Sequence, residues 1–148
     1  MEFDPSQYPH SFSREVYLCE TDAFGHVNSV SFIAYLESAR FDLFKKLELF
    51  NPKDLLAFNL IIARIECDYK NIARYNDKLT IYTRVAEIRS SSFILEHVFL
   101  REEDSSIVAK GRVVLVAFDH AHNRPQPIPQ EWRGKLTRYQ GSSEGAKK

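Results

Sequence analysis

The sequence lacks the features that mark several common classes of protein. No apolar run approaches the roughly 18 residues that span a bilayer. Lysine plus arginine equals aspartate plus glutamate, at 20 each, so no overall charge attracts nucleic acid or an anionic membrane. Two cysteines, Cys19 and Cys67, lie far apart without a CxxC pattern, which indicates a reducing compartment and no disulfide framework. Residues 1–14 carry Glu2, Asp4 and two prolines, so we expect no secretory signal and a cytoplasmic protein.

The remaining composition is that of one folded domain. The chain has 148 residues, of which 44% are hydrophobic, enough for a single packed core. We find no repeat and no internal linker. We therefore expect a lead-in over residues 1–11, one domain over 12–137 and a flexible tail over 138–148.

Hydrophobic periodicity predicts one long helix among strands. An apolar stripe at helical spacing runs from Asn28 to Leu47, and Asn28 is a suitable N-cap. Alternating or β-branched segments predict five strands, and a short helix is expected over 130–137. The predicted strands are Phe12 to Cys19, Leu60 to Tyr69, Lys78 to Ile88, Ser92 to Arg101 and Ile107 to Asp119.

The links between the later strands are short, which implies antiparallel hairpins. Gly111 inside the last strand predicts close approach of another backbone or a local bend, and Pro125, Pro127 and Pro129 are expected to end the sheet. A single long helix can bury its stripe only by lying across one face of such a sheet. The predicted class is α+β, with five antiparallel strands and one long helix.

The most informative segment runs from Thr21 to Ser29 and reads Thr-Asp-Ala-Phe-Gly-His-Val-Asn-Ser. It sets one acid, Asp22, in a glycine-containing loop just before a helix N-terminus. The first amides of a helix have no partner within the helix, and the helix dipole adds partial positive charge there. An acid beside such donors can attack a carbonyl, or direct water at it, while the amides hold the carbonyl oxygen. This arrangement favours acyl transfer.

The order of elements and several motifs resemble one enzyme family. The string from Asp22 to Ser29, followed by Tyr-Leu-Glu-Ser-Ala-Arg over 35–40, resembles the 4-hydroxybenzoyl-CoA thioesterase-like group of hotdog-fold acyl-CoA thioesterases. Later landmarks of the family are matched by Asp68-Tyr69, by 73–77, by Ser91-Ser92-Phe93 and by 124–129. The resemblance implies a hotdog fold, in which a curved five-stranded sheet wraps a central helix.

The resemblance also implies a function. The loop acid of the family is catalytic, which assigns that role to Asp22, and the implied reaction is hydrolysis of a CoA thioester without a metal or other cofactor. A homodimer or homotetramer with sites at subunit interfaces is implied as well. Some relatives carry an aromatic residue where this chain has Ser29, so a preference for aromatic acyl groups does not carry over.

The loop residues have distinct expected roles. Asp22 is a nucleophile or a general base, with capping of its own loop as the structural alternative. Gly25 is expected to adopt a positive φ and to let the thioester approach the backbone. Backbone amides near Asn28 to Val30, including that of Ser29, are the expected oxyanion donors, with Asn28 itself a cap. His26 either contacts substrate or steadies the loop.

Residues outside the loop are candidates for substrate binding. Glu37 lies three residues before Arg40, which indicates a structural ion pair or a carboxylate that positions water. The hairpin Arg89-Ser90-Ser91-Ser92 carries groups that hold phosphate, such as those of CoA, or is an ordinary polar turn. Further candidates for substrate contact are Tyr69, Arg74 and Lys70. No metal site is expected, because His120 and His122 have no further cluster of ligands.

Three functions compete on these observations. The first is an acyl-CoA thioesterase, with an acyl carrier protein as an alternative carrier. The second is a non-catalytic acyl-CoA or lipid-binding module, since a fold does not fix function. The third is a hydratase or dehydratase, against which stands the lack of a well-partnered basic histidine. Thiol release from a panel of acyl-CoAs distinguishes the first from the others.

Overall fold

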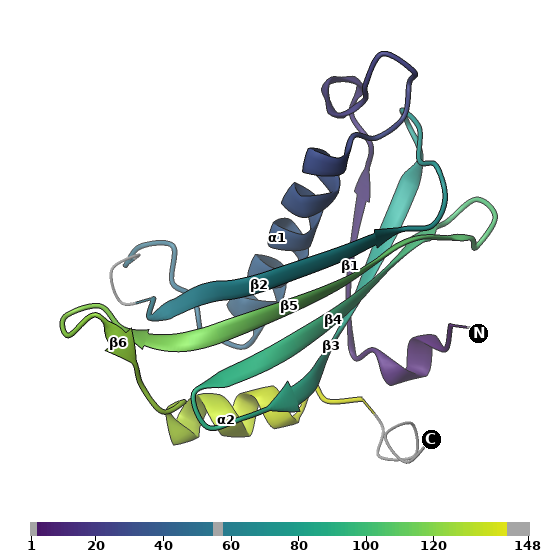
Figure 1. Cartoon of the computed structure of the whole chain (residues 1–148). Helices are drawn as coiled ribbons and strands as arrows, with labels where there is room; N and C mark the ends of the chain where they lie inside the picture. The colour runs from purple at the N-terminus through teal and green to yellow at the C-terminus, as the bar shows by residue number, and fades with distance from the viewer. Residues whose placement is uncertain (1–2, 55–57, 142–148) are drawn as a thin grey trace.

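A curled antiparallel sheet carries two helices on its inner face in the computed structural model, which describes residues 3–54 and 58–141 (Figure 1). The long helix and the four later strands have the predicted positions. The elements are the 3-10 turns η1 (Pro5–Gln7) and η2 (Leu18–Glu20), the helices α1 (Ser29–Lys46) and α2 (Gln130–Thr137), and the strands β1 (His10–Glu15), β2 (Leu60–Tyr69), β3 (Lys78–Ile88), β4 (Ser92–Arg101), β5 (Ile107–Asp119) and β6 (Arg124–Pro125).

The first strand ends earlier than the alternating pattern predicted. β1 stops at Glu15, whereas the prediction ran to Cys19. The chain then leaves the ladder because the Glu20 carboxylate accepts the N–H of Tyr17 at 2.8 Å and closes the turn η2. A local side-chain bond of this kind competes with strand pairing.

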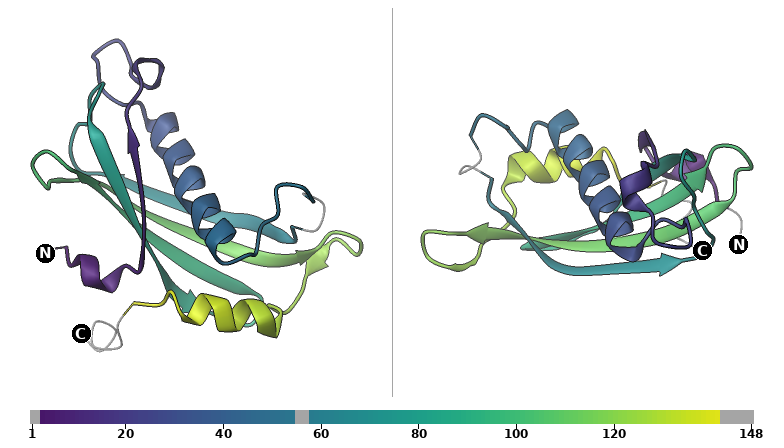
Figure 2. Two further views of the ribbon diagram at one scale, coloured as in Figure 1. Left: turned by 180° about the vertical axis from the view of Figure 1, so that it is seen from behind. Right: turned by 90° about the horizontal axis from the view of Figure 1, so that it is seen from above.

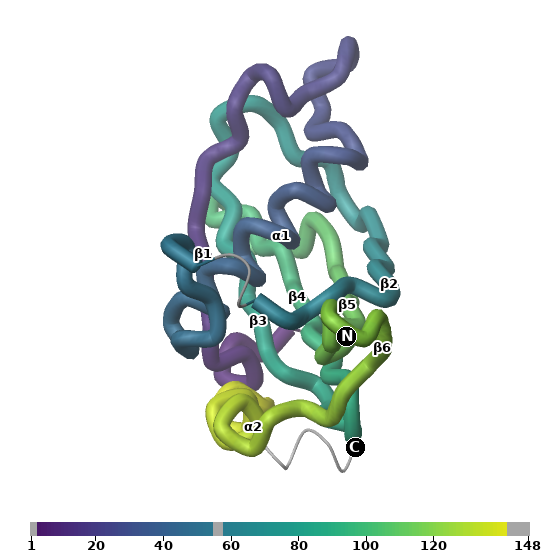
Figure 3. The backbone as a smooth tube through the Cα atoms, turned by 90° about the vertical axis from the view of Figure 1, so that its left-hand side faces the viewer, coloured from purple at the N-terminus to yellow at the C-terminus, as the bar shows by residue number. Residues whose placement is uncertain are grey.

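The sheet order is β1-β3-β4-β5-β2, and all neighbours are antiparallel, as the short links predicted. α1 follows β1 at one edge and leads to β2 at the other, so it crosses the whole inner face. Figure 2 shows both helices on this one side of the curved sheet, and Figure 3 shows the sheet curling around α1. This is the predicted hotdog arrangement. No helix among the described residues is long and apolar enough to cross a membrane.

Two expectations about β5 need correction. Pro125 does not end the sheet, because β6 pairs with the end of β5 through Phe118 and Pro125. Proline has no backbone N–H, and an edge strand tolerates it because one of its sides makes no hydrogen bonds to another strand. Gly111 accommodates a side chain and not another backbone. A Cβ at this position would lie 2.6 Å from Cδ2 of Leu36 on α1. The glycine therefore lets the helix lie close to the sheet.

The predicted stripe of α1 is the centre of the core. Asn28 caps the helix, with its Oδ1 accepting the N–H of Ser31 at 2.8 Å. The stripe residues are all buried: Phe32, Leu36, Ala39, Leu43 and Leu47. Full burial of one such side chain contributes about 1.5–3 kcal/mol, so this face holds the helix on the sheet.

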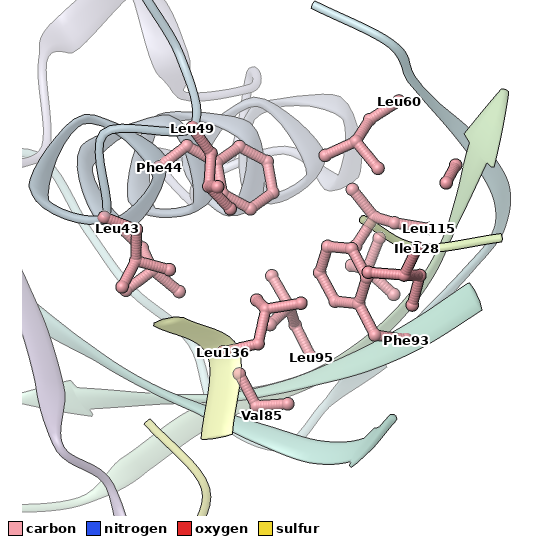
Figure 4. Packing of buried hydrophobic residues seen from close by; sticks show 13 residues of the cluster. Leu43, Phe44, Leu49, Leu60, Val85, Phe93, Leu95, Leu115, Ile128 and Leu136 are labelled. Atoms are coloured by element: carbon pink, nitrogen blue, oxygen red, sulfur yellow. The ribbon is translucent and has the colours of Figure 1, made fainter. Parts of the chain in front are cut away.

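A polar row divides the core beneath α1. Cross-strand pairing aligns one inner-facing residue from each of five strands, namely His10, Thr83, His97, Gly111 and Cys67. On one side lies the loop-end cluster, which includes Phe12, Ile81, Phe99 and Ala109. On the other side lies the hairpin-end cluster, in which side chains from α1, the sheet and α2 point toward one another (Figure 4). The labelled members of that cluster include Leu43, Phe44, Phe93, Leu95 and Leu136.

Candidate active site

The loop between η2 and α1 is closed at its base and carries the predicted acid. Thr21 and Val27 form a β-bridge, and the N–H of Asp22 donates to the carbonyl of His26 at 2.8 Å. Gly25 has φ of 76°, a left-handed conformation that favours glycine, as predicted. The loop is therefore a defined turn and not a loose connection.

The Asp22 carboxylate is held by its own loop. Its Oδ1 accepts the N–H of Phe24 at 2.8 Å and that of His26 at 3.2 Å. This is the capping geometry that the sequence left open as the structural alternative. Both bonds use the same oxygen, so Oδ2 has no hydrogen bond to the described residues. The residue is exposed in the single chain, which leaves this second oxygen accessible.

The N-terminus of α1 follows directly after the loop. The Asn28 side chain accepts the N–H of Ser31. The N–H groups of Ser29 and Val30 come before the first hydrogen bonds within the helix, so they have no partner among the described residues, and both residues are exposed. The N–H of Asn28 donates to the carbonyl of Glu20 at 3.1 Å, which ties the start of the helix to the loop. An acid and two free helix amides thus lie on adjoining turns of chain.

Two of the predicted substrate-binding residues lie beside this loop. The Tyr69 hydroxyl donates to the carbonyl of Ser29 at 3.3 Å, and Arg74 forms a β-bridge with His26. Tyr69 and Arg74 also line an open cleft of about 540 Å³, together with Lys70, Asn71, Ile72 and Arg101. The fold therefore brings the acid loop, the helix N-terminus and a basic cleft to one end of the sheet.

The other predicted phosphate site lies at the opposite end of the same chain. The β3–β4 hairpin of Arg89, Ser90, Ser91 and Ser92 is beside α2, while the acid loop is at the far end of the sheet (Figure 1). The guanidinium of Arg89 pairs with Glu87, with Nε 3.0 Å from Oε1, and this pair raises the pKa of Arg89. Arg133 of α2 donates to the carbonyls of Arg89 and Ser90. A single chain does not bring these groups to Asp22.

The predicted pair on the long helix is loose. Nη2 of Arg40 lies 4.0 Å from Oε2 of Glu37, and the arginine is 2% exposed while the glutamate side chain is 68% exposed. Burial lowers the pKa of Arg40, and the charge of Glu37 opposes that effect. The ion pair exists as predicted, but most of the Glu37 carboxylate faces solvent.

The His120–His122 segment makes only a local contact. His122 Nδ1 lies 2.7 Å from Oδ2 of Asp119, and the described residues contain no group of three or more histidine, cysteine or acidic side chains that could hold a metal. The bond steadies the turn between β5 and β6. It lowers the pKa of Asp119.

Comparison with known proteins gives the family. The model of the thioesterase-like superfamily matches residues 16–136, which include the acid loop, α1 and all of α2 except its last residue. The chain belongs to the thioesterase-like superfamily. This membership confirms the predicted resemblance, the hotdog fold and the class of thioester hydrolases.

Individual relatives agree with this placement in the thioesterase-like superfamily. The long-chain acyl-CoA thioesterase FadM of Escherichia coli K12 is 26% identical over 115 residues, which are 78% of this chain and 87% of FadM. The structure of a predicted thioesterase from Bacillus stearothermophilus matches with a TM-score of 0.80 and 30% identity, over 88% of this chain and 95% of that one. A thioesterase from Thermus thermophilus, complexed with coenzyme A and Zn, matches with a TM-score of 0.77 and 27% identity, over 90% and 95% of the two chains.

Sequence reasoning missed four residues that the structure places around these groups. Arg14, Glu20 and Tyr35 come together behind the acid loop, and Arg133 supports the β3–β4 hairpin. The contacts of Tyr35 and Arg133 join elements that meet only in the folded chain, so no local pattern predicts them. The one usable signal was the spacing of Glu20 three residues after Tyr17, which suits a side chain that closes a turn.

Proposed function

We propose that this chain is an acyl-CoA thioesterase in which Asp22 is the central catalytic group. The observation that carries the proposal is the position of its carboxylate, held through one oxygen in a closed loop immediately before the free amides of α1. In a member of the thioesterase-like superfamily, this arrangement suits attack on a thioester carbonyl. Water is consumed, and a carboxylic acid and CoA are released.

The geometry is compatible with two forms of the reaction. Because Oδ1 accepts the loop amides, Oδ2 is left to attack the thioester carbonyl carbon or to take a proton from water. Attack would break the C–S bond, with CoA leaving as a thiolate that takes up a proton, and would give a transient mixed anhydride that water then hydrolyses. In both forms the carbonyl oxygen gains negative charge, which the amides of Ser29 and Val30 can stabilise. One such donor contributes about 2.7–4 kcal/mol in the transition state.

We propose that the complete site forms between two subunits. β2 has a neighbour on one side only among the described strands, and an unpaired edge favours pairing with another chain. If two β2 strands pair antiparallel about a twofold axis, the Leu60 end of the partner lies beside the Tyr69 end of this chain. The β3–β4 hairpin is at the Leu60 end, since Ile61 and Ser92 both pair with Val116.

Such a dimer joins the two sets of predicted residues. The partner's hairpin would approach the acid loop, so that Arg89 and the three serines could contact CoA phosphates while Arg74 and Lys70 line the cleft next to Asp22. Doubling of this dimer would give the predicted homotetramer. We further propose that the enzyme acts in the cytoplasm without a cofactor, with CoA entering only as part of the substrate.

The test is thiol release from a panel of acyl-CoAs by the wild type and by Asp22→Asn. Asparagine keeps an oxygen for the loop amides but cannot act as a nucleophile or base, so we expect turnover to fall by about 10²–10⁴-fold. The matched control is Asp119→Asn. Oδ1 of Asp119 caps its own turn in a similar way, accepting the N–H groups of Ala121 and His122 at the other end of the sheet.

The outcomes separate the competing functions. Loss of turnover in Asp22→Asn alone supports the proposal, whereas equal turnover in both variants removes Asp22 from the chemistry. A wild type that binds acyl-CoA without releasing thiol supports the binding module. Hydration of an enoyl-CoA without thiol release supports a hydratase, and activity restricted to acylated carrier protein replaces CoA as the carrier.

A further inference from the structure

A half-buried acid lies two residues before Asp22. The Glu20 side chain is 17% exposed, and both of its oxygens lie 2.6 Å from Nη2 of Arg14 on β1. Its Oε1 also accepts the N–H of Tyr17 at 2.8 Å. A carboxylate with these donors is held in one place, because charge-assisted hydrogen bonds are shorter and stronger than neutral ones.

Arg14 is fixed in turn by two aromatic rings. Its guanidinium carbon lies 4.1 Å from the ring centre of Tyr35 and 5.1 Å from that of Tyr17. Tyr35 is fully buried on α1 and packs against Phe32 and Phe99. Burial, and then the neighbouring Glu20 carboxylate, raise the pKa of Tyr35. Its hydroxyl approaches that carboxylate but makes no well-formed hydrogen bond among the described residues.

The main chain of Glu20 connects this cluster to both parts of the candidate site. Its carbonyl accepts the N–H of Asn28, the cap of α1, at 3.1 Å. The next residue, Thr21, forms the bridge with Val27 that closes the acid loop. Displacement of Glu20 would therefore move the acid and the helix amides relative to each other.

We propose that Glu20 and Arg14 are positioning residues, which set the distance between the Asp22 carboxylate and the first amides of α1. The inference rests on the proposed function for its catalytic consequence. The pair touches no reacting atom, and it acts through the main chain of the loop. Tyr35 supports the pair by holding the guanidinium against the helix.

The perturbation is Glu20→Gln, which removes the charge and replaces one acceptor oxygen with an NH₂ group facing Arg14. Misplacement of a catalytic group by about 1 Å can reduce rate by about 10²-fold. We therefore expect kcat to fall by about 10–100-fold, with a change in KM of less than about three-fold, since substrate contacts are untouched. Combining it with Arg14→Met should cause little further loss, because the two side chains act as one unit.

The matched control is Glu96→Gln. It breaks the pair of Arg84 and Glu96, whose closest atoms are 2.8 Å apart and whose side chains are 27% and 31% exposed, on the outer face of the sheet. This variant should lose some thermal stability, though less than Glu20→Gln because its pair is more exposed, while keeping kcat. Equal kcat for Glu20→Gln and the wild type overturns the inference, and so does an equal loss of kcat in the control.

A second readout does not depend on activity. Amide hydrogen exchange at Phe24, His26 and Asn28 reports the bonds to Asp22 Oδ1 and to the Glu20 carbonyl. In Glu20→Gln we expect these amides to exchange about ten-fold faster or more. The substitution weakens the charged hydrogen bonds between the Glu20 side chain and Arg14, which hold this part of the loop in place. Unchanged exchange refutes the positioning role even if the wild type proves inactive. A wild type without thiol release, but with faster exchange in the variant, refutes only the proposed function.

Discussion

The buried histidine of the polar row predicts how stability depends on pH. His97 is 1% exposed, and its Nδ1 lies 2.8 Å from the Thr83 hydroxyl, while its Nε2 has no partner among the described residues. Burial is the main cause that lowers the pKa of His97 to about 3, followed by the charge of Arg40 and by His10. The ring is therefore neutral in the folded protein throughout the mildly acidic range.

The sign of the effect follows from comparing the two states. A histidine in the unfolded chain titrates near pH 6.5, whereas folded His97 does so only near pH 3. Below pH 6.5 the unfolded state binds a proton that the folded state does not. The free energy of unfolding therefore decreases as the pH is lowered from about 6.5, and this decrease ends near pH 3. One proton changes the free energy of unfolding by about 1.4 kcal/mol per pH unit. Between pH 6.5 and 4.5 the loss is about 2–3 kcal/mol.

The assay is urea unfolding at several pH values between 7.5 and 4.5, followed by the fluorescence of Trp132, the single tryptophan, which packs against the hairpin-end cluster. His97→Asn keeps a polar group near the Thr83 hydroxyl but does not titrate. It should start from a lower stability and then show a shallower decline, by about one proton. Burial also lowers the pKa of His10, opposed by Asp42, so some slope remains in the variant.

His120→Gln is the control, because this ring is exposed on the turn after β5. It should leave the wild-type slope unchanged. Parallel curves for the wild type and His97→Asn would refute the reasoning, since they would mean that His97 binds its proton equally well in both states.

Three further substitutions test the packing and capping of α1 and α2. Gly111→Ala should lower the free energy of unfolding by about 1–3 kcal/mol, because its Cβ would press on Leu36; urea curves matching the wild type would contradict the close approach. Gly134→Ala has no atom within 4 Å of the new Cβ and should raise stability by about 0.5–1 kcal/mol, so a loss would show a neighbour that the structure lacks. Asn28→Ala removes the cap that accepts from Ser31 and should cost about 1 kcal/mol, and an unchanged midpoint would mean that another group caps α1.

Local chemistry explains why much of the fold could be predicted. The stripe of α1, its cap at Asn28 and the bounds of β2 follow from adjacent residues, and the structure confirms them. The strict alternation predicted for β2 is not observed, because the register shifts between Ile62 and Arg64. The glycine turn of the acid loop was predictable for the same reason, since a positive φ at Gly25 is a local requirement. The family motif added the topology that periodicity alone does not fix.

The errors and omissions mostly involve contacts that hydrophobic periodicity does not encode. The end of β1 depends on the carboxylate of Glu20, and the neighbour of Gly111 is a side chain from α1. Strand periodicity encodes neither contact, although the three-residue spacing of Tyr17 and Glu20 suits a side chain that closes a turn. The hairpin of Arg89 was grouped with Asp22 on chemistry alone, and one chain holds them at opposite ends of the sheet. Only a second subunit could unite them.

The polar row has a consequence for how this protein can change. Its residues lie between most of the loop-end cluster and the hairpin-end cluster, and Ile65 packs against both, so an altered volume away from Ile65 has few apolar neighbours through which to strain the other side. Substitutions on the two sides should therefore combine additively. The half of the interior around α2 can accept new side chains, in evolution or in engineering, while the turn that carries the acid keeps its shape.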